Sequence, residues 1–267
     1  MNKIYLFAIL LLGFFLRPCL ANESGIWYKP VTSVKWHIQL QGEVNTSYPA
    51  ELYDIDLFDS PASLIEQLHV SGKHVICYFS AGSSEKWRPD YSKFKKAEKG
   101  KGLTGWPGEN WLDIRSSNVK EIMMARIDMA KQKGCDGIDP DNVEGYANKS
   151  GFPLTAQDQI DYNGFLAYEA HKKGMAAALK NDLGQIKDLA GLFDFSVNEQ
   201  CFQYKECEKL KPFIALNKPV LNIEYKQNYV KNAVQRQALC EKSLSLKFST
   251  LILPLGLNNK FRYSCQE

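Results

Sequence analysis

Short apolar segments recur along the chain and alternate with segments of helical periodicity. Eight of them are rich in β-branched and aromatic residues and have the length of strands. We therefore expect eight strands, in residues 34–40, 51–57, 73–80, 134–140, 174–180, 192–198, 218–225 and 248–255.

Helices are expected between most of these strands. Residues 60–72 begin with Ser60 as a capping residue, followed by proline, and end at a glycine. Residues 116–134 and 155–174 repeat apolar positions over several turns and also end at glycines. The alternation favours a single-domain α/β protein, a (β/α)₈ TIM barrel. An open doubly wound sheet is the alternative, but no Gly-rich phosphate loop follows an early strand.

The N-terminus has the layout of a secretory signal peptide. Lys3 precedes an apolar run over residues 4–16, and Pro18 and Ala21 follow. We expect cleavage after Ala21, which leaves residues 22–267 as a single mature domain, either secreted or periplasmic. The apolar run is too short to span a membrane comfortably, so no stable membrane association is expected after cleavage. A lipid anchor at Cys19 is disfavoured by the proline before it.

Charge and composition exclude some partners. The chain has 33 Lys and Arg against 30 Asp and Glu, and removal of the signal peptide takes away Lys3 and Arg17, so the mature chain is nearly neutral. Basic residues do not cluster with aromatic ones, and the basic stretch 93–102 is interpreted as a solvated loop. No nucleic-acid partner is expected, and nothing implies a cofactor or an oligomer.

Six cysteines remain after signal cleavage, an even number that makes disulfides plausible in an exported protein. Two of them share the short segment 201–207, and Cys240 with Cys265 would tie down the C-terminus. Cys77 and Cys135 lie in apolar runs and are interpreted as small core residues. The set is Cys77, Cys135, Cys201, Cys207, Cys240 and Cys265.

Acidic residues gather at the ends of the predicted strands. Asp139 lies at the end of the fourth strand and Asp141 just past it, and Asp182, Glu199 and Glu224 end or follow the next three. Because reactive groups of a TIM barrel stand at the C-terminal strand ends, we expect these carboxylates to meet on one rim. The opposite strand ends carry short Gly and Lys turns.

A rim of carboxylates with aromatic neighbours is typical of a carbohydrate site. Glycoside hydrolysis needs one protonated acid and one ionised carboxylate. Mutual repulsion raises the pKa of at least one crowded carboxyl, which helps to keep a proton donor protonated. The aromatic residues near these strand ends or in the loop after the third strand are Tyr78, Trp87, Trp106, Trp111, Tyr146 and Tyr225.

Other interpretations of single residues remain. Residues 139–144 offer only part of the oxygen pattern of a calcium loop, so no metal site is expected. Asp136 is interpreted as a turn residue and His171 as a structural helix residue. Arg88 and Asp90 form either a loop-ordering ion pair or a substrate clamp, and the sequence favours neither.

A series of motifs resembles glycoside hydrolase family 114, the endo-α-1,4-polygalactosaminidase-type TIM barrels. The motifs follow the family's order over about residues 27–225. They are "YDIDLFD", "VICYFSAGSSEKWRPD", "WPGENWLDIR", "KGCDGIDPDNVEGY", "GFPLTAQDQIDYNGFLAYEAHKKG", "LKND", "FDFSVNEQCFQYKEC" and "KPVLNIEY".

The resemblance implies an extracellular, retaining, endo-acting enzyme that cleaves α-1,4 links in a galactosamine-containing polysaccharide. By motif, Asp141 is the nucleophile and Glu199 the acid/base, with Glu224 as the main rival for the acid/base role. Where the family often has Glu, this chain has Asp139. The residues expected to bind substrate are Asp139, Asn142, Lys180, Asn181, Asp182, Asn198, Glu224, Tyr225, Tyr78 and Trp87.

Two further hypotheses compete. A deacetylated galactosamine polymer is cationic, and an acidic rim would attract it even if the protein did not cleave it. The alternative function is therefore a non-catalytic secreted module that binds polysaccharide. A metal-dependent hydrolase or deacetylase would need histidines near the carboxylates, and the four histidines are not at strand ends.

Overall fold

The computed structural model describes residues 27–267. The predicted signal peptide, residues 1–21, and the alternative anchor Cys19 lie outside the described residues. No helix among residues 27–267 is long and apolar enough to cross a membrane.

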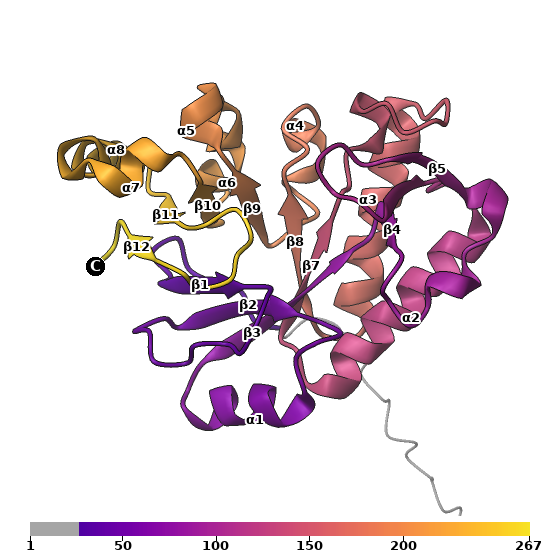
Figure 1. Cartoon of the computed structure of the whole chain (residues 1–267), viewed down its shortest axis with the longest axis horizontal. Helices are drawn as coiled ribbons and strands as arrows, with labels where there is room; N and C mark the ends of the chain where they lie inside the picture. The colour runs from indigo at the N-terminus through magenta and orange to yellow at the C-terminus, as the bar shows by residue number, and fades with distance from the viewer. Residues whose placement is uncertain (1–26) are drawn as a thin grey trace, which may run out of the picture.

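Eight parallel strands form one sheet, in chain order, and each overlaps a predicted strand (Figure 1). The order contains no reversal, which excludes the doubly wound alternative, and the sheet curls round on itself. The predicted α/β barrel class is therefore confirmed. The strands are β1 (Trp36–Gln39), β2 (Leu52–Asp56), β3 (His74–Ser80), β7 (Gly137–Asp141), β8 (Ala176–Lys180), β9 (Phe195–Glu199), β10 (Val220–Glu224) and β11 (Ser249–Ile252).

Helices cover the outer face of the sheet. The three predicted ones are α1 (Ala62–Val70), α2 (Ser117–Lys133) and α3 (Ala156–Lys172). A capping box begins α3, since Thr155 and Asp158 bond each other's backbone N–H, and Gly134 in the left-handed region ends α2. The later helices are α4 (Ile186–Leu189), α5 (Cys201–Tyr204), α6 (Lys211–Ala215), α7 (Gln227–Lys231) and α8 (Ala233–Ser245).

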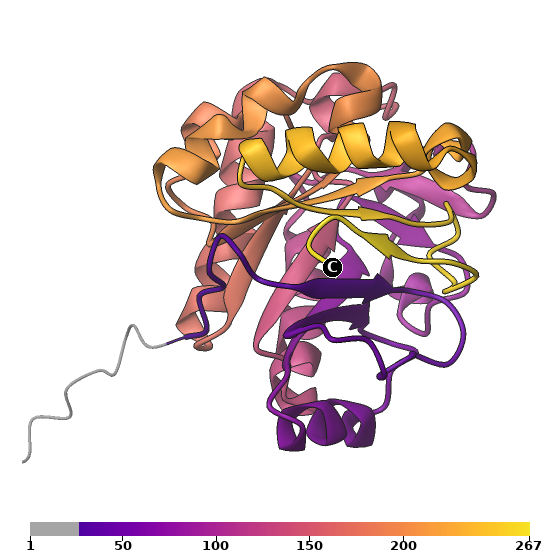
Figure 2. The same cartoon turned by 90° about the vertical axis from the view of Figure 1, so that its left-hand side faces the viewer.

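Within residues 27–267, strand pairing runs from β1 to β12 (Tyr263–Ser264) without closing into a ring, and side chains link its two ends. Strand β12 pairs antiparallel with β11 and lies beside β1 in both views (Figures 1 and 2). Arg262 donates to the Trp36 carbonyl at 3.0 Å, and the Trp36 indole donates to the Ser249 carbonyl at 2.9 Å. The first and last barrel strands are thus joined through side chains and β12.

The interior of the ring follows a two-residue alternation along each strand. Ala176, Ala178 and Lys180 of β8 share one face, with the alanines in an inner cluster that also holds Phe195 and Val197 of β9. In β2, β7, β8 and β9 the inner positions are apolar or glycine at the N-terminal end and polar at the C-terminal end. The interior of the barrel is therefore apolar at its N-terminal end and polar at the C-terminal ends of these strands.

A three-stranded antiparallel sheet replaces the loop predicted after the third strand. It consists of β4 (Ser83–Glu85), β5 (Lys99–Gly102) and β6 (Glu109–Leu112), in the order β4-β6-β5. Four 3₁₀ turns also occur, η1 (Tyr91–Lys93), η2 (Lys96–Glu98), η3 (Gly145–Ala147) and η4 (Cys207–Leu210).

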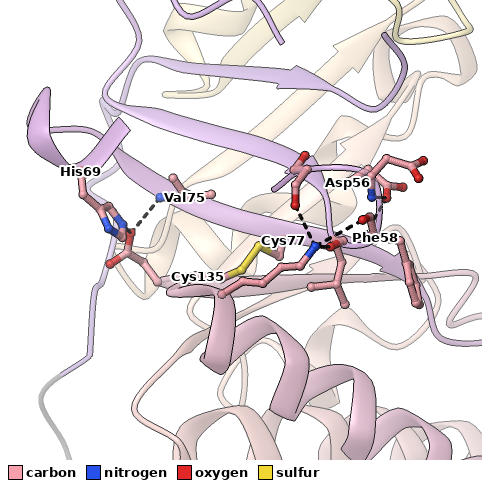
Figure 3. Close-up of a disulfide and its surroundings, with 11 residues drawn as sticks. Asp56, Phe58, His69, Val75, Cys77 and Cys135 are labelled. Carbon is pink, nitrogen blue, oxygen red and sulfur yellow. Dashed lines mark hydrogen bonds and ion pairs between the residues drawn. A yellow bond between two sulfur atoms is a disulfide. The ribbon is translucent and has the colours of Figure 1, made fainter. Parts of the chain in front are cut away.

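Two side-chain interpretations are corrected. Cys77 and Cys135 are not free core residues but a disulfide that joins β3 to the segment before β7 (Figure 3). Arg88 does not pair with Asp90; it bonds Asp56 and Glu85, whereas Asp90 bonds Arg126 on α2.

The remaining predicted roles agree with the structure. Cys240 bonds Cys265, which fastens the C-terminal segment to α8. Asp136, just before β7, accepts hydrogen bonds from the Val75 N–H and from His69, and His171 on α3 pairs with Asp194 at 2.8 Å.

Of the three disulfides within residues 27–267, the Cys77–Cys135 bond should stabilise the chain most. It joins residues 58 apart in sequence, and the chain-entropy model gives about 4 kcal/mol for such a loop. Cys201 and Cys207 are only 6 apart, for which the model gives about 2 kcal/mol. Urea unfolding of the two double-alanine variants tests this order. Equal losses, or a larger loss for the short loop, would contradict it.

Candidate active site

The C-terminal ends of β7, β8 and β9 place three charged side chains around one cavity. Asp141 ends β7, Lys180 ends β8 and Glu199 ends β9. All three line a cavity of about 810 Å³. Because the strands are adjacent and parallel, their C-terminal ends bring these groups together, as predicted for the rim.

Lys180 is the central group of this cluster. Its side chain is 2% exposed, and its Nζ lies 3.3 Å from Asp141 Oδ1, 3.8 Å from Asp139 Oδ2 and 4.0 Å from Glu199 Oε2. Burial alone would lower the pKa of Lys180, but Asp141, Glu199 and Asp139 outweigh it and hold that pKa above its usual value. The ammonium group therefore stays charged.

Two tyrosines each donate to one carboxylate. Tyr78 OH donates to Asp141 Oδ2 at 2.8 Å, and Tyr225 OH donates to Glu199 Oε1. Burial and the adjacent carboxylate raise the pKa of both phenols, so both remain protonated donors. Asn181 adds a third fixed contact, since its Nδ2 donates to Glu199 Oε2 at 3.2 Å.

The backbone around Asp141 is held by the chain after β3. Ala81 and Gly82 both donate backbone N–H groups to the Asp141 carbonyl, at 2.8 and 3.0 Å. A Cβ on Gly82 would lie 1.8 Å from the Asn142 carbonyl oxygen, so only glycine fits there. Asn142 itself is in the left-handed region, at φ 62°, and donates its N–H to Asp141 Oδ1.

A buried carboxyl pair lies beneath Lys180. Asp54 on β2 and Asp139 on β7 are both 0% exposed. Burial raises the pKa of both groups, and their mutual repulsion raises that of Asp54 further, while Lys180 opposes the shift. The pair therefore retains a proton near neutral pH and lies below the cavity rather than in its wall.

Comparison with known proteins decides the family. Residues 17–267 match glycoside-hydrolase family GH114. The chain belongs to family GH114. It is a glycosidase, and the predicted family and enzyme class are confirmed.

Solved structures agree with this GH114 assignment. Aspergillus fumigatus Ega3 in complex with galactosamine has a TM-score of 0.85 at 46% identity, over 89% of this chain and 97% of that one. The glycoside hydrolase domain of PelA from Pseudomonas aeruginosa has a TM-score of 0.67 at 11% identity, over 85% and 96%, and shows the fold alone. An uncharacterized protein of Deinococcus radiodurans is 25% identical over 244 residues, 78% of this chain and 79% of its own length.

The residues predicted to bind substrate divide into two groups. Six lie in or directly beneath the cavity wall or bond a carboxylate that lines it, and the other four are placed elsewhere. The first group is Tyr78, Asp139, Asn142, Lys180, Asn181 and Tyr225. The second is Trp87, Asp182, Asn198 and Glu224.

The second group is directed away from the cavity for identifiable reasons. Asn198 directly precedes Glu199, and Glu224 directly precedes Tyr225. Because Glu199 and Tyr225 point inward and side chains alternate along a strand, Asn198 and Glu224 point to the outer face of the sheet. There Glu224 Oε1 accepts the Phe202 N–H of α5 at 2.9 Å. Asp182 accepts from Asn163 of α3 at 3.0 Å, and Trp87 is 55% exposed outside the cavity lining.

Some cavity residues were not among the predicted ones. Glu109 of β6 and Glu144 after β7 both line the cavity, beside Trp106 and Trp111, which were among the aromatic residues expected near the site. Glu144, the last residue of "DPDNVE", directly follows a predicted strand and could have been found from the sequence. Glu109 lies in a segment whose strand pairing no sequence pattern indicated. Within residues 27–267, no group of three or more His, Cys, Asp or Glu is arranged to hold a metal ion.

Asp182 should make stability depend on pH. Burial raises its pKa from 3.8 to about 7, so the folded chain holds a proton that the unfolded chain loses. Stability should therefore fall as pH rises from about 4 to about 7, by on the order of 3 kcal/mol from this group.

The Asp182→Asn variant should lose that part of the pH dependence. Denaturant unfolding between pH 4 and pH 8 measures it, with Asp188→Asn, an exposed residue of α4, as the matched control. If Asp182→Asn and wild type show parallel pH profiles, Asp182 is ionised in the folded state.

Proposed function

We propose that this GH114 protein is an exported, retaining, endo-acting glycosidase that cleaves α-1,4-linked galactosamine-containing polysaccharide. The observation that carries the proposal is the cluster in which one ammonium group and two phenols hold Asp141 and Glu199 at the same cavity. Asp141 acts as the nucleophile and Glu199 as the acid/base.

The two carboxylates have distinct tasks in this mechanism. Asp141, nearest to Lys180 and bonded by Tyr78, attacks the anomeric carbon as the glycosidic bond breaks. Glu199 gives its proton to the leaving oxygen and then takes a proton from the water that hydrolyses the glycosyl-enzyme. The 27% exposure of the Glu199 side chain gives that water access.

The spacing supports retention. Asp141 Oδ1 and Glu199 Oε2 lie 3.3 and 4.0 Å from the same nitrogen, so they can be no farther apart than the sum of these distances. Retaining pairs are separated by about 5 to 5.5 Å, which falls inside that limit, whereas most of the inverting range of about 6.5 to 9.5 Å exceeds it.

Strand direction supports Glu199 over Glu224 as the acid/base. Glu199 faces the cavity beside Lys180, while Glu224 is 0% exposed and accepts bonds from Phe202 N and Asn222 Nδ2. A carboxyl with that environment holds α5 against the sheet and has no path to a glycosidic oxygen.

The substrate class rests on similarity and charge. Ega3, 46% identical, was crystallised with galactosamine. Four carboxylates line the cavity, which suits a polymer with positively charged amino groups. Trp106 and Trp111 offer aromatic faces on which sugar rings stack. Three disulfides are consistent with an oxidising compartment and so with export.

Loss of either catalytic carboxylate should abolish cleavage without unfolding the chain. Asp141→Asn and Glu199→Gln should each lower kcat on galactosamine polymer by about 10³-fold or more, because each removes a group needed at the transition state. Reducing-end release and sizing of the products measure this, and endo action predicts intermediate-length oligomers from the start.

The matched control is Glu121→Gln, the same chemical change on the exposed side of α2. It should retain wild-type activity. If Asp141→Asn keeps full activity while remaining folded, the assignment of the nucleophile is wrong.

A further inference from the structure

One buried carboxyl of the barrel has no part in the mechanism above. Asp54 lies on β2, two residues after Leu52 of the inner apolar cluster, so strand alternation turns it to the barrel interior. It is 0% exposed and does not line the active-site cavity. Asp54 therefore has no contact with substrate, and any effect that it has on the reaction must pass through another residue.

The partner of Asp54 is Asp139 of β7. Strand β3 lies between β2 and β7, and the two carboxyls meet in front of it with a side-chain hydrogen bond. None of their four oxygens accepts a hydrogen bond from an N–H or hydroxyl group of residues 27–267. Because an ionised carboxylate is only an acceptor, two carboxyls can bond each other only if one of them holds a proton.

The surroundings of Asp54 are apolar. Its register partners are Ile38 on β1 and Ile76 on β3, and both belong to the inner apolar cluster. Two negative charges at this level would lack both water and hydrogen-bond donors and would repel each other. The pair of carboxyls is therefore most stable with a single proton.

Lys180 determines which of the two carboxyls holds that proton. Its Nζ lies 3.8 Å from Asp139 Oδ2, whereas no ion pair within residues 27–267 joins it to Asp54. The nearby ammonium group favours the anionic form of Asp139, so the proton stays on Asp54. Burial, and next the charge of Asp139, raise the pKa of Asp54 well above its usual value, in agreement with this assignment.

We propose that Asp54 is a positioning residue that stays protonated and donates to Asp139, so that one negative charge, and not two, lies beneath Lys180. This charge balances the attraction of the two carboxylates above and keeps the ammonium group in contact with both. Lys180 has three N–H donors and three carboxylates at 3.3 to 4.0 Å, of which Asp139 is the one below the cavity. The role rests on the proposed function, because the two upper carboxylates are the proposed catalytic pair.

A fixed charge beneath Lys180 would matter as the reaction proceeds. When Asp141 bonds the anomeric carbon it becomes an ester and loses its negative charge, and when Glu199 gives its proton to the leaving oxygen it gains one. The negative charge above Lys180 thus moves from one carboxylate to the other. The constant charge on Asp139 keeps the ammonium group between them during this change.

Loss of the Asp54 proton should lower activity at alkaline pH. Since its pKa is raised, Asp54 keeps the proton at neutral pH and releases it as the pH rises further. The second negative charge would then draw the ammonium group of Lys180 downward and away from Asp141. The titratable groups that face the pair are Lys180, Asp141, Glu199 and the Tyr78 phenol, which bonds Asp141.

Two substitutions separate the proton from the shape of the side chain. Asp54→Asn is close in shape to the protonated acid and still offers an N–H to Asp139, but it cannot ionise. Asp54→Leu fills the same space without a donor. The control is Asp188→Asn, the same chemical change at an exposed residue of α4. The measurements are kcat and KM on galactosamine polymer from about pH 5 to about pH 9, with thermal melting to show which variants fold.

The Asp54→Asn variant should have a kcat within about threefold of wild type at about pH 6, with an unchanged KM. The ratio of its kcat to that of wild type should rise at least about threefold between about pH 7 and about pH 9, because only wild type gains the second charge. Asp54→Leu should lower kcat at least about tenfold at every pH, and Asp188→Asn should follow wild type. If Asp54→Leu does not fold, the pH profile of Asp54→Asn carries the test.

Parallel pH profiles of Asp54→Asn and wild type would overturn the proposed role, as would a loss of kcat in Asp54→Asn as large as that in Asp54→Leu. A second measurement needs no substrate. The infrared C=O stretch of protonated carboxyls at about pH 7 should lose intensity in Asp54→Asn but not in Asp188→Asn, and an unchanged band would show that Asp54 is ionised. A wild-type protein that cleaves no galactosamine polymer contradicts the proposed function, and the positioning role fails with it.

Discussion

The active site depends on one buried ammonium group. Lys180 contacts the proposed nucleophile, the proposed acid/base and a buried aspartate below them, and it is 2% exposed. Its charge makes it possible to bring several carboxyls together away from water, because each would otherwise repel the others. Burial raises the pKa of Asp54 and of Asp139 below it, which limits the number of negative charges that this single cation must offset.

The strand alternation of the barrel supplies this arrangement. Inner positions change from apolar to polar toward the C-terminal strand ends, so Asp141, Lys180 and Glu199 rise from an apolar floor that includes Ala176 and Ala178. The small alanines leave room at the centre of the ring, and a Cβ on Gly137 would already lie 2.7 Å from Ile76. The apolar packing inside the barrel and the charged cluster at the C-terminal strand ends thus both follow from which residues occupy the inner strand positions.

The sequence was sufficient to predict the elements and the site's location, because both depend on local patterns. All eight strands and the helices α1, α2 and α3 were expected from periodicity, whereas α8, with 13 residues, was not, and the rim carboxylates followed from the direction of the strands. Side-chain direction was less accessible. Glu199 and Glu224 both end apolar strands, and which of them faces inward depends on a register that shifts every side chain when it moves by one residue.

Features that depend on distant pairing could not be predicted. The small sheet that carries Glu109 joins residues 83–85 to 109–112, and Cys77 and Cys135 become neighbours only when β3 pairs with β7. Asp54 could likewise not be recognised from the sequence, because its raised pKa depends on burial next to Asp139. Glu109 and Asp54 complete the cavity and its electrostatics, while the proposed catalytic pair lies on strands that the sequence identifies.

The central claim is that Lys180 holds Asp141 and Glu199 as a double-displacement pair. Proton NMR of the first reducing ends released from an α-1,4-linked galactosamine oligomer tests it most directly, if recorded before mutarotation. The account predicts the α-anomer as the initial product, since two inversions restore the configuration. Initial release of the β-anomer would contradict it.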